Sequence, residues 1–325
     1  MRKLYIIGNG FDKAHGLNTD YMAFRQYLEE NQPNFLMWFE NIYGLVMPDF
    51  DDPYMSIDEE EWDEIVSYNL WSELEKQLAY PGIEDMLDMA CDTVESMDLE
   101  SGPIGIKDTL DYHWRAQYGF IEELPVHLKS WIKRINIRDL KPMNDDLVDN
   151  DTDAFFSFNY TRVLEEVYGI PKVYHVHGSI DSVLDDDLII GHCNDKEIKE
   201  RRELCREAEW RGDEGDASIQ NAIADFLEHL HKDTAFLLRW SQRFFASLTD
   251  VDQVIVIGWS AGEVDLPYLE AIRDSVSEKT KWTVYYYAKN PADKYAYNQL
   301  KEAFEKCGIS DRFQVEYDDS KNFWK

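Results

Sequence analysis

One serine has a spacing that could serve nucleophilic catalysis. The stretch VIVIGWSAG, residues 254–262, places Ser260 in a G-x-S-x-G pattern after a run of β-branched residues. This pattern is typical of the nucleophile elbow of serine hydrolases, in which an acidic residue and then a histidine follow the serine along the chain. All eight histidines precede Ser260, and the last is His231. We therefore expect Ser260 to form, with Gly258, a tight loop against the ribose or phosphate of a ligand.

Two histidines have the spacing of a strand end. In KVYHVHGSI, residues 172–180, strand alternation puts His175 and His177 on one face, and His177 comes directly before a glycine. A histidine that protrudes there can act as a general acid or base. The alternative is a metal site in which His192 or Cys193 joins the pair. No Asp or Glu falls at a matching spacing, so we predict no metal.

Two further strand ends carry polar or flexible residues. In YIIGNGFDKAHGLNT, residues 5–19, Gly8 and Gly10 let the backbone turn sharply and approach a phosphate, although Lys13 stands where a G-x-G-x-x-G motif has its third glycine. A plain strand-to-helix turn is the alternative. In FFSFNYTRVLEE, residues 155–166, Asn159 follows a strand directly. Its amide either caps the next helix or faces a ligand.

Short apolar runs predict the strands that position these loops. Because most runs are continuous, we expect strands buried on both faces of a parallel sheet. Helical patterns follow several of them, as at Asp265 to Val276 and Tyr295 to Cys307. This rhythm predicts an α/β fold with a doubly wound, mostly parallel sheet. The predicted strands are residues 3–7, 154–158, 172–176, 188–190, 253–257, 283–288 and 313–317.

Two long stretches interrupt this rhythm. Residues 35–150 and 196–249 hold amphipathic helical patterns, such as residues 60–80 with Ile65, Leu74 and Leu78 at helical spacing and Tyr68 and Trp71 alongside. We interpret both as large helical insertions into a single domain of residues 1–325. The acidic stretches inside the first insertion are expected to be solvated loops or helix starts.

The composition limits the classes of partner. The chain carries 65 acidic and 33 basic residues, a net charge of −32. This balance opposes nonspecific binding to nucleic acid or anionic membranes, which need a basic surface, but it allows a small anionic ligand bound by backbone N–H groups. The four cysteines show no disulfide or metal spacing. No apolar run suits a signal peptide or a membrane helix, so we expect a cytoplasmic protein.

Taken in order, the four loops resemble the Sir2-like family of NAD-consuming enzymes. SFNYTRVLE is similar to that family's TxNYDxLxE, HVHGS to its catalytic HG, and IVIGWSAG to its GTS loop. GNGFDKAHGLNTDYMAF, WSELE, FNYT and GWSAGEVD resemble more closely the AbiH family of phage abortive-infection proteins. The resemblance spans nearly the whole chain and implies a Rossmann-like, Sir2-like fold and a role in antiviral defence.

The resemblance also implies site residues. His177 matches the catalytic histidine and Asn159 the catalytic-site asparagine. The implied NAD-binding residues are Gly8, Asn9, Gly10, Phe11, Asp12, Thr19, Thr161, Gly258, Ser260 and Asp265. Thr161 departs from the pattern, because Sir2-like proteins usually have Asp there. The zinc-module cysteines of the deacetylases are absent, which argues against a protein deacetylase.

The activity that the resemblance implies is NAD⁺ glycohydrolase chemistry, a hydrolase reaction with NAD as substrate. In that reaction positive charge develops on the ribose while a neutral nicotinamide leaves. Asn159 would hold a water or a ribose hydroxyl, and His177 would act as base. Two alternatives stay open: a nucleotide-sensing module that binds without cleavage, and a metal-dependent nuclease, which the net charge disfavours. The phage trigger and the oligomeric state stay open, and a homo-oligomer is one of the options.

Overall fold

Two compact units make up the chain. The computed structural model describes residues 1–50, 57–96, 106–180, 188–290 and 292–325. The sheet unit comprises Met1–Asp20, Leu128–Ile189 and Asp233–Lys325, and the helical unit comprises Tyr21–His127 and Ile190–Lys232. Each unit is therefore assembled from segments that are distant in sequence.

The sheet unit is built on a six-stranded, wholly parallel sheet in the order β3-β2-β1-β4-β5-β6. This is the strand order of a doubly wound α/β fold, and it reverses direction between β1 and β4. The predicted doubly wound α/β fold is confirmed. The strands are β1 (Lys3–Ile7), β2 (Ala154–Ser157), β3 (Tyr174–His175), β4 (Gln253–Ile257), β5 (Lys281–Tyr286) and β6 (Val315–Asp319).

Burial on both faces explains why the strands are continuously apolar. Leu4 and Ile6 of β1 lie in one buried cluster, whereas Tyr5 and Ile7 lie in a second cluster on the opposite face. Successive side chains of a strand point to opposite faces, so a strand covered on both sides needs apolar residues at every position. The central strand β4 divides its side chains in the same way.

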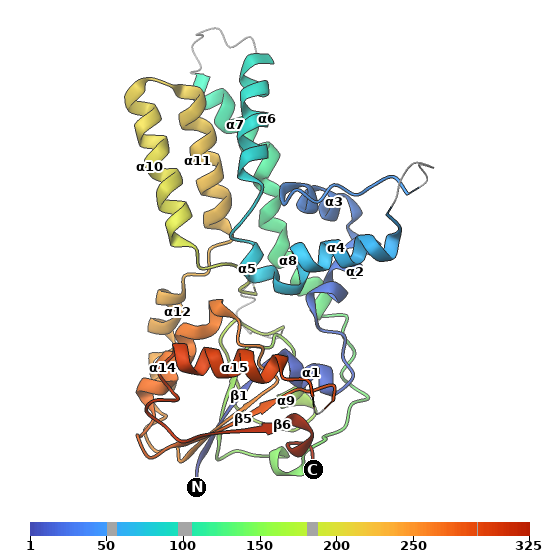
Figure 1. Ribbon diagram of the computed structural model, residues 1–325, viewed down its shortest axis with the longest axis vertical. Helices are drawn as coiled ribbons and strands as arrows, with labels where there is room; N and C mark the ends of the chain where they lie inside the picture. The colour runs from blue at the N-terminus through green and yellow to red at the C-terminus, as the bar shows by residue number, and fades with distance from the viewer. Residues whose placement is uncertain (51–56, 97–105, 181–187, 291) are drawn as a thin grey trace. The chain divides into compact units, whose positions relative to one another are not determined.

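Helices cover each face of the sheet (Figure 1). Tyr268 and Ile272 of α14 and Phe304 of α15 pack in the cluster that contains Leu4. Phe11 of α1 packs in the other cluster. The helices of this unit are α1 (Asn9–Ala14), α9 (Val163–Glu166), α12 (Thr234–Trp240), α13 (Gln242–Ala246), α14 (Leu266–Ser275) and α15 (Tyr295–Lys306), with 3₁₀ helices η3 (Asp145–Leu147), η4 (Glu263–Asp265) and η5 (Ser320–Asn322).

The helical unit contains no strand among its described residues, only an isolated bridge between His192 and His231. Polar caps begin its helices: Asn194 accepts a hydrogen bond from the Glu197 amide, and Asp213 from the Asp216 amide. Its helices are α2 (Tyr21–Asn31), α3 (Pro33–Ile42), α4 (Glu59–Asn69), η1 (Trp71–Glu73), α5 (Leu74–Gln77), α6 (Ile83–Ser96), α7 (Ile106–Tyr118), η2 (Gly119–Glu123), α10 (Asp195–Arg211), α11 (Glu214–His229) and the start of α8 (Leu124–Ile132).

The borders of the helical unit differ from the predicted insertions at 35–150 and 196–249. The unit begins at α2 because Phe24 of that helix packs against Trp71. It ends at Lys232 because the next helices belong to the sheet unit, where Phe245 of α13 is part of a sheet cluster. An amphipathic period marks a helix but not the surface that its apolar face covers.

One local prediction was wrong. Residues 188–190 form no strand, although Leu188 and Ile190 are buried; the Ile189 amide donates to the His177 carbonyl over 3.0 Å instead. Apolar character alone reports burial, not the backbone conformation that provides it.

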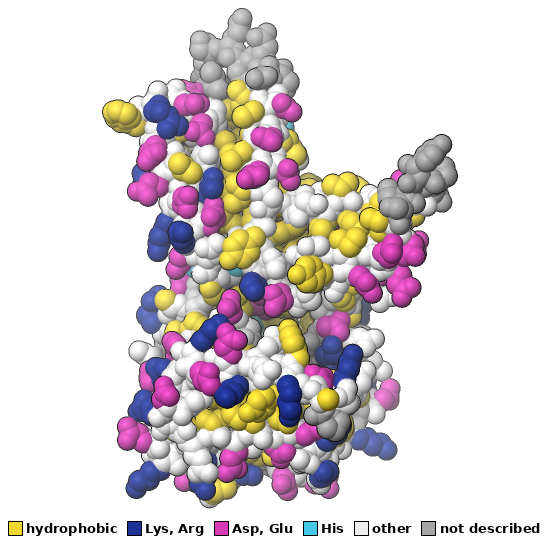
Figure 2. Space-filling view, in the orientation of Figure 1, with side chains coloured by type: hydrophobic (Ala, Val, Ile, Leu, Met, Phe, Trp, Pro, Cys, Tyr) yellow, Lys and Arg dark blue, Asp and Glu magenta, His cyan; other side chains and the backbone are white. Residues whose placement is uncertain are grey.

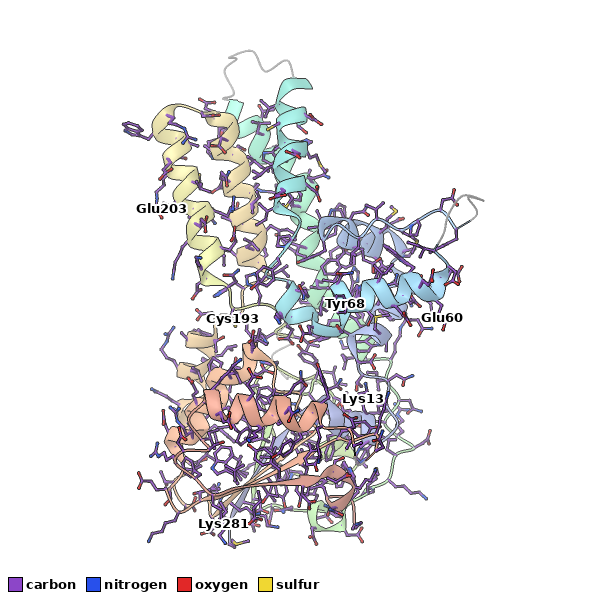
Figure 3. The ribbon with its side chains drawn as sticks, in the orientation of Figure 1. Lys13, Glu60, Tyr68, Cys193, Glu203 and Lys281 are labelled. Carbon is purple, nitrogen blue, oxygen red and sulfur yellow. The ribbon has the colours of Figure 1, made fainter. Side chains whose placement is uncertain are left out.

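The helical pattern at residues 60–80 is confirmed, and it is divided among α4, η1 and α5. Trp71 lies in the core, whereas Tyr68 of α4 is 83 % exposed (Figure 3).

Charged side chains cover the visible surface of both units. Figure 2 shows Asp and Glu side chains spread over that face, with Lys and Arg scattered among them. Among the described residues, no helix is both long and apolar enough to cross a bilayer.

A buried ion pair holds the first helices of the helical unit together. The Arg25 Nε donates to Glu40 Oε1 over 2.7 Å, and both side chains are nearly inaccessible to water. The Trp71 indole donates to the same carboxylate oxygen over 2.8 Å. Removing one partner of such a pair leaves an uncompensated buried charge. This network therefore fixes α2, α3 and η1 against one another.

We expect Glu40→Ala to lower the free energy of unfolding by about 3–5 kcal/mol, because it removes the buried carboxylate that Arg25 and Trp71 share and leaves Arg25 with the exposed carboxylates of Asp63 and Glu29. Glu29→Ala is the matched control. Its carboxylate lies 3.9 Å from the same guanidinium but is half exposed, so we expect a change of about 0.5 kcal/mol or less. Denaturant unfolding followed by circular dichroism measures both. Equal effects for the two variants would contradict this assignment.

Candidate functional site

Four strand-end loops meet at the carboxyl edge of the sheet. They follow β1 at Gly8, β2 at Phe158, β3 at Val176 and β4 at Gly258. Because all strands are parallel, their carboxyl ends share one edge, and the β1 and β4 loops flank the point where the strand order reverses. Lys13 on α1, labelled in Figure 3, helps to locate the β1 loop.

The glycines of the β1 and β4 loops interlock. The Gly10 amide donates to the Gly258 carbonyl over 2.7 Å. Gly258 has a φ of +71°, and a Cβ there would lie 2.2 Å from the Phe11 nitrogen. A Cβ on Gly8 would lie 2.5 Å from the Trp259 Cα. These glycines are therefore required by direct packing of backbone against backbone, a reason that the sequence did not indicate.

The other predicted residues of the β1 loop are engaged within the sheet unit. The Asn9 amide nitrogen donates to the Thr19 carbonyl over 2.9 Å, and the Thr19 hydroxyl donates to Asn9 Oδ1 over 2.5 Å. Phe11 is fully buried and packs against His15 and Tyr168. Asn9 and Thr19 thus close the loop, while Phe11 anchors α1 in the core.

A polar cluster joins the β1 and β2 loops. The Thr161 hydroxyl donates to Asp12 Oδ2 over 2.5 Å, and the Asn159 amide nitrogen donates to the Gly8 carbonyl over 3.2 Å. All three side chains are at least nine-tenths buried. Asp12 Oδ1 and Asn159 Oδ1 have no hydrogen-bond donor among the described residues. The Gly8 contact fixes the orientation of the Asn159 amide, so its oxygen is a directed, unsatisfied acceptor.

Burial perturbs the Asp12 carboxyl. Loss of water raises the pKa of Asp12 from 3.8 to about 6, against the opposing effects of Thr161, Asn159 and His175. The folded protein therefore binds this proton more tightly than the unfolded chain does. The stability contributed by the neutral acid is complete below about pH 4 and is lost as the pH rises to about 6.

His175 is held by protein groups on both sides of its ring. Its Nδ1 lies 2.7 Å from the Asn159 carbonyl and its Nε2 lies 2.9 Å from Glu165 Oε1. Both nitrogens therefore face oxygen acceptors rather than a position for a metal ion. His192 and Cys193, the other ligands considered, belong to the helical unit. In the part of the chain that the structure describes, no group of three His, Cys, Asp or Glu side chains could hold a metal.

His177 lies in an aromatic enclosure next to a carboxylate. Its Nε2 is 3.6 Å from Asp265 Oδ1, and the His177 side chain is 3 % exposed. The rings of Phe158, Tyr160 and Tyr268 have centroids 5.7, 6.4 and 5.7 Å from the imidazole. Asp265 ends η4, so the β4 loop carries the carboxylate to the histidine of the β3 loop. At 3.6 Å the two groups are close enough for an ion pair when the imidazole is charged, but too far apart for a hydrogen bond.

Ser260 is exposed at the same edge. Its neighbour Ala261 has a φ of +60°, so the backbone strain falls one residue after the serine. Nucleophile elbows place the serine itself on the strained turn. Within the described ranges, no hydrogen bond joins Ser260 to a histidine. The geometry agrees with the prediction that Ser260 is a loop residue, although its contact with a ligand stays a prediction.

The predicted residues are linked through contacts at the sheet edge. The β1, β2 and β4 loops are joined by the hydrogen bonds above, and Phe158 stacks on Trp259 at a centroid distance of 6.0 Å. That these residues line a single ligand pocket stays a prediction.

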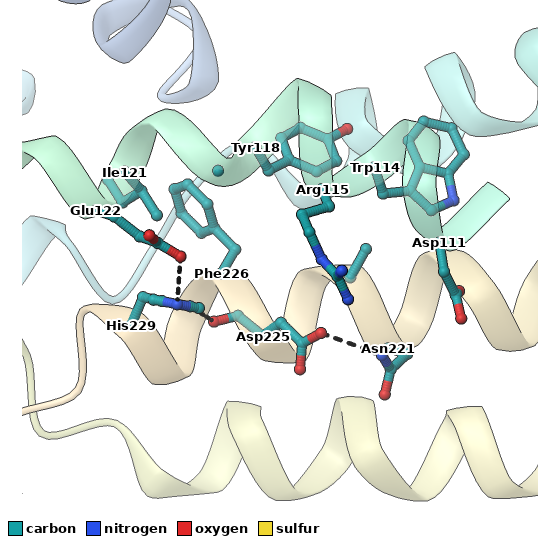
Figure 4. A pocket seen from close by; sticks show the side chains of 12 residues that line it. Asp111, Trp114, Arg115, Tyr118, Ile121, Glu122, Asn221, Asp225, Phe226 and His229 are labelled. Carbon is teal, nitrogen blue, oxygen red and sulfur yellow. Dashed lines mark hydrogen bonds and ion pairs between the residues drawn. The ribbon is translucent and has the colours of Figure 1, made fainter. Parts of the chain in front are cut away.

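A cavity of about 130 Å³ lies between α7 and α11 of the helical unit (Figure 4).

Several residues of the site escaped the analysis of the sequence. Glu165 pairs with His175, and Tyr268 covers His177 from α14. Glu165 is part of the SFNYTRVLE motif, so its motif position was a usable signal. Tyr268 had none, because its distance from His177 in sequence gives no indication of contact.

Comparison with known proteins identifies one relationship. The model of the family described as "Bacteriophage abortive infection AbiH" matches residues 4–286. No curated protein and no solved structure matches the chain.

We expect Gly258→Ala to destabilise the sheet unit by at least about 2 kcal/mol, because alanine is strained at positive φ and its Cβ would overlap the Phe11 backbone. Gly262→Ala in the same loop is the control. Its φ is −56° and the nearest atom to the new Cβ is 3.7 Å away. Equilibrium unfolding distinguishes them, and a Gly258→Ala protein as stable as Gly262→Ala would refute the interlocked-loop description.

Proposed function

This chain belongs to the bacteriophage abortive infection AbiH family, and on that premise we propose that it binds NAD at the carboxyl edge of its sheet and hydrolyses the bond between nicotinamide and ribose. The observation that carries the proposal is the buried pair of His177 and Asp265 beside the reversal of strand order. Parallel sheets of this order bind dinucleotides at that reversal.

An unsatisfied acceptor of the site supports a ligand with hydroxyl groups. Asn159 Oδ1 is buried without a donor, which costs free energy unless a partner is supplied. A ribose hydroxyl is a donor of the required kind. Gly10 and Ser260 are exposed at the same edge, where backbone and hydroxyl groups can contact a ligand. The glycine contacts do not add support, because the protein itself fills the space above them.

The His177–Asp265 pair can supply general base catalysis. In the proposed mechanism the imidazole accepts a proton from water while its Nε2 faces Asp265. During hydrolysis the bond from ribose to nicotinamide breaks and its electron pair neutralises the pyridinium ring. A water forms the new bond to the ribose carbon and gives its proton to His177. Asp265 then stabilises the imidazolium, as the carboxylate of a catalytic triad does.

A binding module without turnover is the second candidate. Its support is the enclosure of His177 by Phe158, Tyr160 and Tyr268, since substrate must displace part of that packing to reach the imidazole. Thr161 also lacks the carboxylate expected from the Sir2-like pattern. Nucleotide binding without nicotinamide release, before and after phage infection, would favour this candidate.

We expect His177→Ala to retain NAD binding while nicotinamide release falls by about 10²–10⁴-fold, the usual contribution of a positioned general base. His229→Ala is the matched control, because His229 also pairs with a carboxylate, Glu122, but in the helical unit. Chromatography of nicotinamide, with and without chelator, measures release. Unchanged release by the His177 variant of an active protein would contradict the assignment.

Ser260→Ala should have the opposite signature. If Ser260 contributes one hydrogen bond to the ligand, its loss weakens NAD binding by about 0.5–1.5 kcal/mol, roughly 2- to 13-fold, and leaves the rate at saturation in place. Titration calorimetry and saturation kinetics separate the two quantities. Labelling of Ser260 by a serine-directed phosphonate would instead support a nucleophile.

A further inference from the structure

The proposed mechanism leaves one buried acid unused. Asp12 is 1 % exposed, although it lies on the β1 loop at the carboxyl edge of the sheet. One of its oxygens accepts from Thr161, and the other has no donor among the described residues. An ionised carboxylate that is buried without a cationic partner is strongly disfavoured relative to the neutral acid.

The groups around Asp12 do not compensate a negative charge. Thr161 and Asn159 of the β2 loop and His175 of β3 favour the carboxylate, whereas Glu165 of α9 opposes it. No Lys or Arg of the described chain forms an ion pair with Asp12. The loss of water outweighs all of these, and the pKa of Asp12 rises to about 6. The carboxyl therefore titrates just below neutral pH.

Nucleotide binding would make ionisation of Asp12 still less favourable. A dinucleotide bound at this edge brings phosphate charges of the same sign as a carboxylate. Their repulsion acts on ionised Asp12 and not on the neutral acid. A ligand that prefers the protonated protein binds more tightly as the pH falls. By linkage, the bound ligand raises the proton affinity of Asp12 by the same factor by which protonation of Asp12 raises the affinity for the ligand.

We propose that Asp12 is a positioning residue that carries a proton in the nucleotide-bound protein, so that NAD binding near neutral pH takes up one proton. The proton comes from solvent and is held on the carboxyl oxygen that has no donor, while Thr161 keeps the other oxygen in place. This inference rests on the proposed NAD binding, but not on cleavage.

The first test is the dissociation constant of NAD between pH 5 and pH 8, measured by titration calorimetry. For the unmutated protein, we expect binding to weaken by about 100-fold across this range, as a required proton with a pKa of about 6 demands. Asp12→Asn, a neutral isostere, should bind with little dependence on pH. Asp20→Asn is the matched control, since Asp20 is half exposed and paired with Lys13; it should behave as the unmutated protein does.

The second test needs no variant. Calorimetry at pH 7 in two buffers with different heats of ionisation gives the number of protons taken up, for which we expect nearly one. A pH-independent dissociation constant with no proton uptake would overturn the role of Asp12 and leave NAD binding intact. Loss of binding by a folded Asp12→Asn protein at pH 5 would also overturn it, because the neutral form would then be insufficient.

A ligand-free measurement separates this inference from the proposed function. The thermal midpoint of the unmutated protein should fall relative to that of Asp12→Asn as the pH rises from 4 to 7, because only the carboxyl ionises. A parallel response of the two proteins would refute proton binding by Asp12. No NAD binding by the unmutated protein at pH 5 or pH 8 would instead overturn the proposed function, and with it the ligand linkage.

Discussion

The contact between the β1 and β4 loops is the constraint on which the rest of the site depends. Where strand order reverses, two loops must leave adjacent strands, and here they do so with backbone against backbone. The hydrogen bond from Gly10 to Gly258 is possible only because neither residue has a Cβ, and the positive φ of Gly258 aims its carbonyl at the neighbouring loop. This contact sets the path of the β4 loop toward Asp265.

Two polar arrangements are built on this contact, and they differ in kind. Asn159 and Thr161 bind the β1 loop through Gly8 and Asp12, so the β1 and β2 loops are held by hydrogen bonds with two acceptors left over. His177 is held instead by aromatic packing and one carboxylate. Buried polar groups without partners are costly, and proteins usually retain them where a ligand or a reaction uses them.

The helical unit achieves its stability differently. It has no sheet among its described residues, and its first helices meet around the buried Arg25–Glu40 pair. Such a pair contributes little net stability over an apolar core but penalises any other arrangement of the helices that carry it. The chain passes from the sheet unit into this unit and back twice, through the segments Tyr21–His127 and Ile190–Lys232. An exact arrangement of the helices therefore matters.

Local pattern determined much of this protein. Continuous apolar runs predicted the sheet, and all six strands overlap a predicted segment, because a strand buried on both faces needs apolar residues throughout. The order of Ser260 after every histidine argued against a serine hydrolase, and the strand ends made His177 and Asn159 candidate site residues, which stays a prediction. Tertiary structure alone decided that Asp12 meets Thr161, that Asp265 reaches His177, and that residues 188–190 run as a loop. Periodicity encodes which face of an element is buried, whereas contacts between loops depend on strand register and on backbone approaches that no local pattern records.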